Sequence, residues 1–115
     1  MQYMLLIYGE EGKWASLSPE RVSEVMASYF AYTEELAKAG KFKAGDELQP
    51  VETAKTVSLE TGKRQVIDGP FADTKEALGG YYLIEADSMD EALEWAAKCP
   101  GAHFGRIEVR PIVAR

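Results

Sequence analysis

Cysteine and histidine are almost missing from this chain of 115 residues, which has Cys99 as its one cysteine and His103 as its one histidine. A single cysteine excludes an intrachain disulfide. Metal sites usually take three or four His, Cys or acidic ligands, and no His/Cys cluster exists here. Phosphate-binding and dinucleotide-binding glycine fingerprints are also missing. We therefore expect no metal and no cofactor.

Long apolar runs and basic clusters are missing as well. No run approaches the roughly 20 apolar residues that a membrane span needs. The opening residues lack a basic region and a small-residue cleavage site, so we expect no signal peptide and a cytoplasmic location. Thirteen basic residues against nineteen acidic ones give a formal charge of −6. That balance argues against a nucleic-acid partner, because nucleic-acid binding depends on clustered Lys and Arg.

The residues present predict one domain over 1–115 with a substantial core, since 46% of them are hydrophobic. Apolar spacing and capping residues predict the order β-α-β-β-β-α-β. The first helix has Ser18 as its N-cap, stops at Gly40 and buries a stripe that includes Phe30 and Leu36. Thr61-Gly62 forms a hairpin turn. The expected strands of this order are 3–8, 55–60, 64–68, 81–86 and 105–112, with 42–48 as a further, short strand candidate. The expected helices are 19–39 and 89–98, with residues 9–17 as a loop.

This order predicts an α+β sandwich of ferredoxin-like kind, with an antiparallel sheet and two helices on one face. The strands at 3–8 and 81–86 are apolar on both faces. Two helices cover only one face of such a sheet, so the other face needs another cover. A second copy of the same sheet is the simplest one, which predicts a homodimer.

Residues 68–82 are the most informative segment. Gly69-Pro70 and Gly79-Gly80 are pairs that typically interrupt helices and strands. Asp73 and Glu76 predict a short capped helical turn that Gly79 stops. Asp68 is the candidate catalytic residue, because a desolvated carboxylate at a strand end suits a general acid or base. Alternatively, Asp68 accepts hydrogen bonds from the backbone of its own turn.

Other residues could line a ligand site near Asp68. Phe71 either lines a pocket or fills space in the core. Lys75 meets an anionic group, pairs with Asp68 or stays solvated. His103 suits proton transfer but lies alone in a glycine-rich loop. The candidate ligand-binding residues are Tyr8, Trp14, Phe71, Lys75, Tyr81, His103 and Arg110, of which Tyr8, Trp14 and Tyr81, together with Tyr82, equally suit a core or a dimer interface.

Several segments resemble the DGPF group of YCII-related proteins. They are Asp68-Gly69-Pro70-Phe71 followed by Thr74-Lys75-Glu76 and Leu78–Ile84, the opening Tyr3–Tyr8, and the closing Ala92–Ala96 and Ile107–Pro111. The resemblance implies a ferredoxin-like fold that pairs into a dimeric α/β barrel. Members of the family largely have no assigned activity, and some are encoded beside extracytoplasmic-function sigma factors. A His–Asp pair has been suggested as catalytic in the broader group, which resembles muconolactone-isomerase-like barrels. Asp68 matches the acid, whereas the first helix offers Tyr29, Tyr32 and Thr33 in place of the histidine.

Three hypotheses about function follow. The first is a homodimeric protein that binds a small anionic or aromatic molecule. The second is an enzyme of isomerase or lyase type, in which Asp68 moves a proton and Lys75, His103 or Arg110 orients the substrate. The third is a protein-binding accessory of a sigma-factor system.

Overall fold

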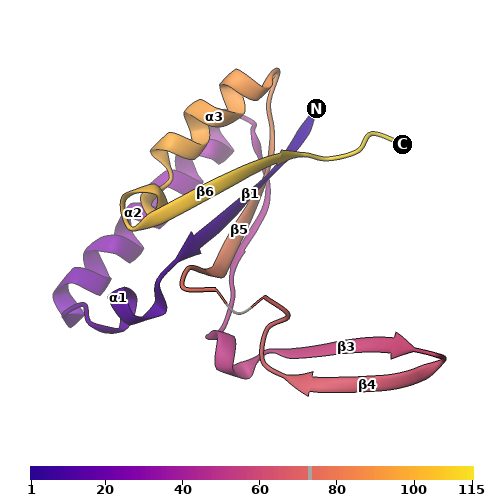
Figure 1. The fold of residues 1–115 in the computed structure, drawn as a ribbon. Coiled ribbons are helices and arrows are strands. Elements are labelled where there is room, and N and C mark those ends of the chain that lie inside the picture. Colours follow the sequence, from indigo (N-terminus) through magenta and orange to yellow (C-terminus); the bar gives the residue numbers. More distant parts are fainter. Residues whose placement is uncertain (73) are drawn as a thin grey trace.

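A four-stranded antiparallel sheet forms the centre of the protein in the computed structural model, which describes residues 1–72 and 74–115. The sheet has the strand order β2-β5-β1-β6. Helices α2 and α3 both lie against one face of it (Figure 1). This arrangement is the predicted α+β ferredoxin-like sandwich. The elements are β1 (Gln2–Gly9), α2 (Pro19–Lys38), β2 (Phe42–Glu47), β5 (Ala77–Glu85), α3 (Met89–Lys98) and β6 (Gly105–Pro111).

A second, two-stranded sheet extends away from the first one. It consists of β3 (Lys55–Glu60) and β4 (Lys63–Asp68), and residues 55–68 are called the β-arm below. Its turn is Thr61-Gly62, as predicted, and both residues have positive φ angles of 51° and 76°. Two positive φ angles match the twist of paired strands. Three short helices complete the chain: α1 (Glu11–Ala15), η1 (Val51–Thr53) and η2 (Pro100–His103).

The core lies between the sheet and the two helices. Leu5, Leu36, Ile84 and Cys99 are fully buried there. The ring of Tyr82 packs edge-on to the ring of Tyr32, with 5.2 Å between the centroids. Such aromatic pairs and the buried aliphatic side chains supply most of the hydrophobic stabilisation of a domain this small.

Helix α2 begins at the predicted residue and ends at Lys38, one residue before the predicted end. The hydroxyl of Ser18 accepts a hydrogen bond from the backbone N–H of Arg21 at 3.1 Å. At the other end Gly40 has a φ of 74°, its N–H donates to Ala37, and the N–H of Lys41 donates to Leu36. These two bonds make a Schellman motif, which terminates helices and favours glycine at this position.

Three local predictions were wrong. Residues 9–17 contain the short helix α1 rather than only a loop. Gly79 does not stop a helix, because Gly79 and Gly80 both lie inside β5. Phe30 is 72% exposed and is not part of the buried stripe of α2. The predicted cap at Asp73 lies outside the described residues.

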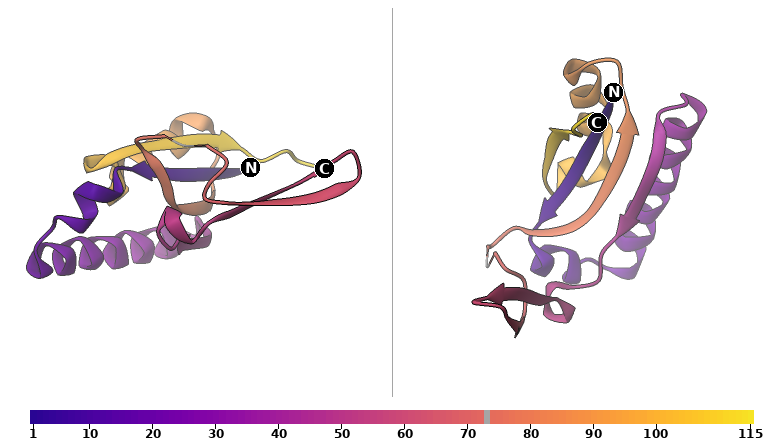
Figure 2. Two further views of the ribbon diagram at one scale, coloured as in Figure 1. Left: turned by 60° about the horizontal axis from the view of Figure 1, so that its bottom comes forward. Right: turned by 90° about the vertical axis from the view of Figure 1, so that its right-hand side faces the viewer.

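The sheet face away from the helices, called the open face below, has no helix over it in the described part of the chain (Figures 1 and 2). Tyr3 and Leu5 point into the core, so Met4 and Leu6 point to the open face by strand alternation. Leu83 joins them because it is the register partner of Met4. Figure 1 shows the β-arm projecting on this same side of the sheet.

Candidate functional site

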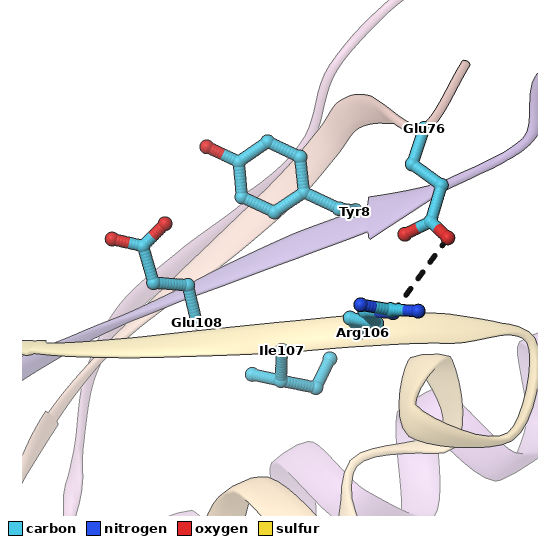
Figure 3. A pocket seen from close by; sticks show the side chains of 5 residues that line it. All are labelled: Tyr8, Glu76, Arg106, Ile107 and Glu108. Atoms are coloured by element: carbon cyan, nitrogen blue, oxygen red, sulfur yellow. Dashed lines mark ion pairs between the residues drawn. The ribbon is translucent and has the colours of Figure 1, made fainter. Parts of the chain in front are cut away.

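An open pocket of about 390 Å³ lies where β1 ends and β6 begins. Tyr8 comes from the end of β1, Glu76 immediately precedes β5, and Arg106 and Glu108 come from β6. Tyr8 and Arg106 are register partners across β1 and β6. Figure 3 shows Tyr8, Arg106 and Glu108 on one side of the strands and Ile107 on the other. The pocket therefore opens on the open face, while Ile107 packs toward the core.

The ion pair between the charged groups of this pocket is weak. Arg106 Nε lies 3.7 Å from Glu76 Oε1, and the arginine side chain is mostly exposed. A long, solvated ion pair contributes little energy, so the guanidinium can exchange this partner for a ligand anion. Glu108 accepts a hydrogen bond from Arg110 Nε at 2.9 Å. A guanidinium, a phenol and two carboxylates thus surround one space of small-molecule size.

The structure places Asp68 outside this pocket. Asp68 ends β4, its side chain is exposed, and Oδ1 lies 2.6 Å from Lys55 Nζ. Neither of the two pockets described has Asp68 in its lining. The neighbouring Gly69 has a φ of 102°. Proton transfer by Asp68 stays a prediction, and within the described chain its partner is a lysine across the β-arm.

Phe71 and Lys75 do not reach the pocket either. Phe71 is 92% exposed, so its predicted role as a core plug is wrong. Lys75 Nζ lies 3.4 Å from Glu10 Oε1 and its side chain is 83% exposed, so the structure fits the solvated alternative for Lys75 and not the pair with Asp68. Trp14 lies on α1 and is partly exposed. The aromatic wall predicted around Asp68 is not assembled by the described residues of a single chain.

The other candidates are dispersed over both faces of the sheet. The Tyr81 hydroxyl donates to Asp46 Oδ2 at 2.8 Å, and this hydrogen bond raises the pKa of the tyrosine. Arg110 touches the pocket only through Glu108. His103 lies on the helix side, in a second hollow of about 170 Å³ that Arg21, Val25, Ser28, Pro100 and Phe104 also line.

Tyr29, Tyr32 and Thr33, the polar candidates on helix α2, have structural roles. The Tyr32 hydroxyl donates to the carbonyl of Trp95 at 2.7 Å, and Thr33 Oγ1 lies 2.7 Å from the hydroxyl of Tyr82. Burial raises the pKa of Tyr29 and of Tyr32 far above the ordinary value. These groups lie in the core on the helix side, and the pocket opens on the opposite face.

Sequence reasoning missed Glu76, Arg106 and Glu108 as pocket residues. A signal for two of them is present in the strict alternation of Arg106, Glu108 and Arg110 with Ile107 and Val109 along β6. Charged side chains that alternate with core residues identify the face opposite the core. Glu76 has no such signal, because its position depends on where β5 begins.

Two classes of site are missing from residues 1–72 and 74–115. No group of three or more His, Cys, Asp or Glu side chains there is arranged to hold a metal ion. Among these same residues no helix combines the length and the apolar character that crossing a membrane requires.

The strand order and the site on the open face define a ferredoxin-like protein with a ligand-sized pocket. The chain belongs to the YCII-related domain family, whose model matches residues 1–114. An uncharacterized protein of Rhizobium meliloti (strain 1021) is 39% identical to it over 114 residues, which cover 97% of this chain and 92% of the relative.

A solved structure has a similar fold, with a TM-score of 0.57 and 19% sequence identity over 98% of this chain and 94% of the other. It is 5-chloro-2-hydroxyhydroquinone dehydrochlorinase (TftG) from Burkholderia phenoliruptrix AC1100, in complex with 2,5-dihydroxybenzoquinone. At this identity the similarity concerns the fold alone. The resemblance to YCII-related proteins read from the sequence is confirmed.

Proposed function

We propose that this protein is a homodimer that binds a small anionic or aromatic molecule in the pocket formed by Tyr8, Glu76, Arg106 and Glu108. The observation that carries the proposal is the position of this polar set at the end of an apolar sheet face that no helix within residues 1–72 and 74–115 covers. An apolar surface with a few convergent polar groups is the usual composition of a small-molecule site.

The dimer part of the proposal rests on the open face. Met4, Leu6 and Leu83 stand together at the middle of this face on the two central strands. A second sheet packed face to face would bury these side chains and close the pocket from above. A stable interface buries about 1,000 Å² or more in total. Two such sheets facing each other would form the dimeric α/β barrel that the family resemblance implies.

The ligand class follows from the groups that line the pocket. Arg106 offers a planar set of donors for a carboxylate or an acidic hydroxyl. Glu76 and Glu108 accept hydrogen bonds from ligand hydroxyls, and the ring of Tyr8 provides an apolar surface beside them. The similar solved structure holds 2,5-dihydroxybenzoquinone, a compact ring with several oxygens. That compound is therefore a reasonable first probe for this chain.

The test is calorimetric titration of the full chain with 2,5-dihydroxybenzoquinone and, separately, with benzoate. We expect at least one of them to bind, and Arg106→Gln to weaken that binding about tenfold or more. Arg115→Gln removes the same charge at the end of the chain and is the matched control. Equal affinities of the wild type and Arg106→Gln, or no binding of either probe, would contradict the proposed site.

A further inference from the structure

We propose that the β-arm packs its apolar face on a second copy of this chain, so that each protomer reaches around its partner. The inference rests on the proposed homodimer and extends it, because the interface then includes the arm as well as the open face of the sheet.

The two faces of the β-arm differ in apolar content, and the face with three aliphatic side chains against one is called the apolar face below. Register partners share a face, and Val57 pairs with Val66 while Leu59 pairs with Arg64. The Lys55–Asp68 ion pair lies on this same face at the base of the arm. The opposite face is mainly polar and holds Thr56, Ser58, Glu60, Lys63, Gln65 and Ile67. Alternation of this kind predicts that one face is buried.

The described part of the chain does not bury the apolar face. Val57 is 62% exposed, Leu59 is 73% exposed and Val66 is 47% exposed. The arm is held at its base, where the N–H of Gly69 donates to Ala54 at 2.7 Å and the hydroxyl of Thr56 donates to Gly69 at 2.8 Å. An isolated two-stranded hairpin is marginally stable in water. The three aliphatic side chains of the apolar face therefore need a surface outside this chain.

The position of the arm identifies that surface. The arm projects on the side of the open face, as Figures 1 and 2 show. The chain has a radius of gyration of 16.0 Å and extents of 47 × 44 × 18 Å. A compact chain of this length has a radius of about 13 Å. A second sheet packed on the open face occupies the space beside the arm. The same partner chain can therefore cover both the open face and the apolar face of the arm.

Charge also favours a second copy. The arm carries three basic and two acidic side chains, in a chain whose formal charge is −6. The arm has a net charge of +1, which leaves −7 on the rest of the chain. Two whole chains repel each other, but contact between the arm of one copy and the acidic remainder of another is locally attractive. A dimer closed by two-fold symmetry uses the same contact twice, once for each arm.

The first test compares Leu59→Lys with Ser58→Lys by sedimentation equilibrium. Both changes add one positive charge to β3, but only position 59 lies on the apolar face. We expect the dissociation constant of the dimer to rise at least tenfold for Leu59→Lys and less than threefold for Ser58→Lys. Equal effects of the two changes would overturn the proposal.

The second test does not depend on the stability of a variant. A photoreactive benzoylphenylalanine is placed at position 57 or 58, and ¹⁴N-labelled and ¹⁵N-labelled chains are mixed before irradiation. We expect mixed-isotope cross-linked peptides from position 57 and several-fold fewer from position 58. Cross-links confined to one isotope at position 57 would overturn the proposal.

These experiments distinguish a failure of the arm contact from a failure of the proposed function. A wild type that stays monomeric at micromolar concentration would remove both the homodimer and the arm contact. A dimer that tolerates Leu59→Lys and still binds ligand through Arg106 would remove the arm contact alone.

Discussion

Tyr8 and Arg106 are register partners across β1 and β6, so their side chains stand next to each other on the open face of the sheet. The sheet joins the first strand and the last strand of the chain at this point. Three of the four polar pocket residues, Tyr8, Arg106 and Glu108, therefore stand on paired strands, and each can be replaced on its own.

Removal of the Tyr8 hydroxyl tests the pocket from its β1 side. We expect Tyr8→Phe to weaken probe binding about three- to tenfold, since one hydrogen bond contributes roughly 0.5–1.5 kcal/mol. Tyr3→Phe makes the same change on the opposite face of the same strand, where Tyr3 lies in the core, and is the control. Calorimetric titration measures both. A larger loss of affinity in Tyr3→Phe would place the ligand elsewhere.

A β-branched side chain at Gly69 tests the turn at the base of the β-arm. The φ of 102° is a conformation that valine adopts only with strain. We expect Gly69→Val to lower the free energy of unfolding by about 1–3 kcal/mol, and Asp68→Asn to lower it by less. Urea unfolding of both variants measures the difference. Equal midpoints would show that the positive φ is not required for folding.

The N-cap of α2 offers a matched pair of serines. Ser18 accepts a hydrogen bond from Arg21, and Ser23 lies exposed within the same helix. We expect Ser18→Ala to cost about 1 kcal/mol of stability, and Ser23→Ala to leave stability nearly unchanged. Thermal unfolding of the two variants decides the point. An equal loss in both would mean that the hydroxyl of Ser18 does not stabilise the helix.

The buried tyrosines make stability fall at high pH. Burial raises the pKa of Tyr29 and of Tyr32 in the folded chain above the ordinary value of 10.0. The folded state then keeps protons that the unfolded state loses, so stability is complete below pH 10 and decreases above it. We expect the tyrosinate absorbance at 295 nm to rise at higher pH in buffer than in urea.

The same titration of Tyr29→Phe should show a weaker decrease of stability above pH 10, because one of the raised groups is gone. Superimposable titration curves in buffer and in urea would contradict the burial of these hydroxyls. The signal comes from six tyrosines. Tyr3 and Tyr82 also lie in the core, and burial raises the pKa of Tyr82 as well, so the difference between wild type and Tyr29→Phe isolates the contribution of Tyr29.

Local features of this protein followed from the sequence by itself. The Ser18 cap, the Gly40 stop and the Thr61-Gly62 turn are each determined by backbone geometry within a few residues. The order of the elements followed from the periods of the apolar residues, and it was enough to predict the ferredoxin-like sandwich. Leu36 was correctly predicted as a core residue, because helical spacing places it on the packed side of α2.

Tertiary structure alone decided which strands pair and which groups meet. The local pattern predicts that Gly79 stops a helical turn, whereas Gly79 and its neighbour Gly80 both lie inside β5. A side chain at Gly80 would come within 3.0 Å of the Asp46 carbonyl on β2, which no local pattern reveals. Likewise, β3 and β4 pair with each other in the β-arm and not with the main sheet, and Tyr8 pairs with Arg106 in the pocket. Such contacts depend on segments far apart in sequence, where spacing carries no information about which residues meet.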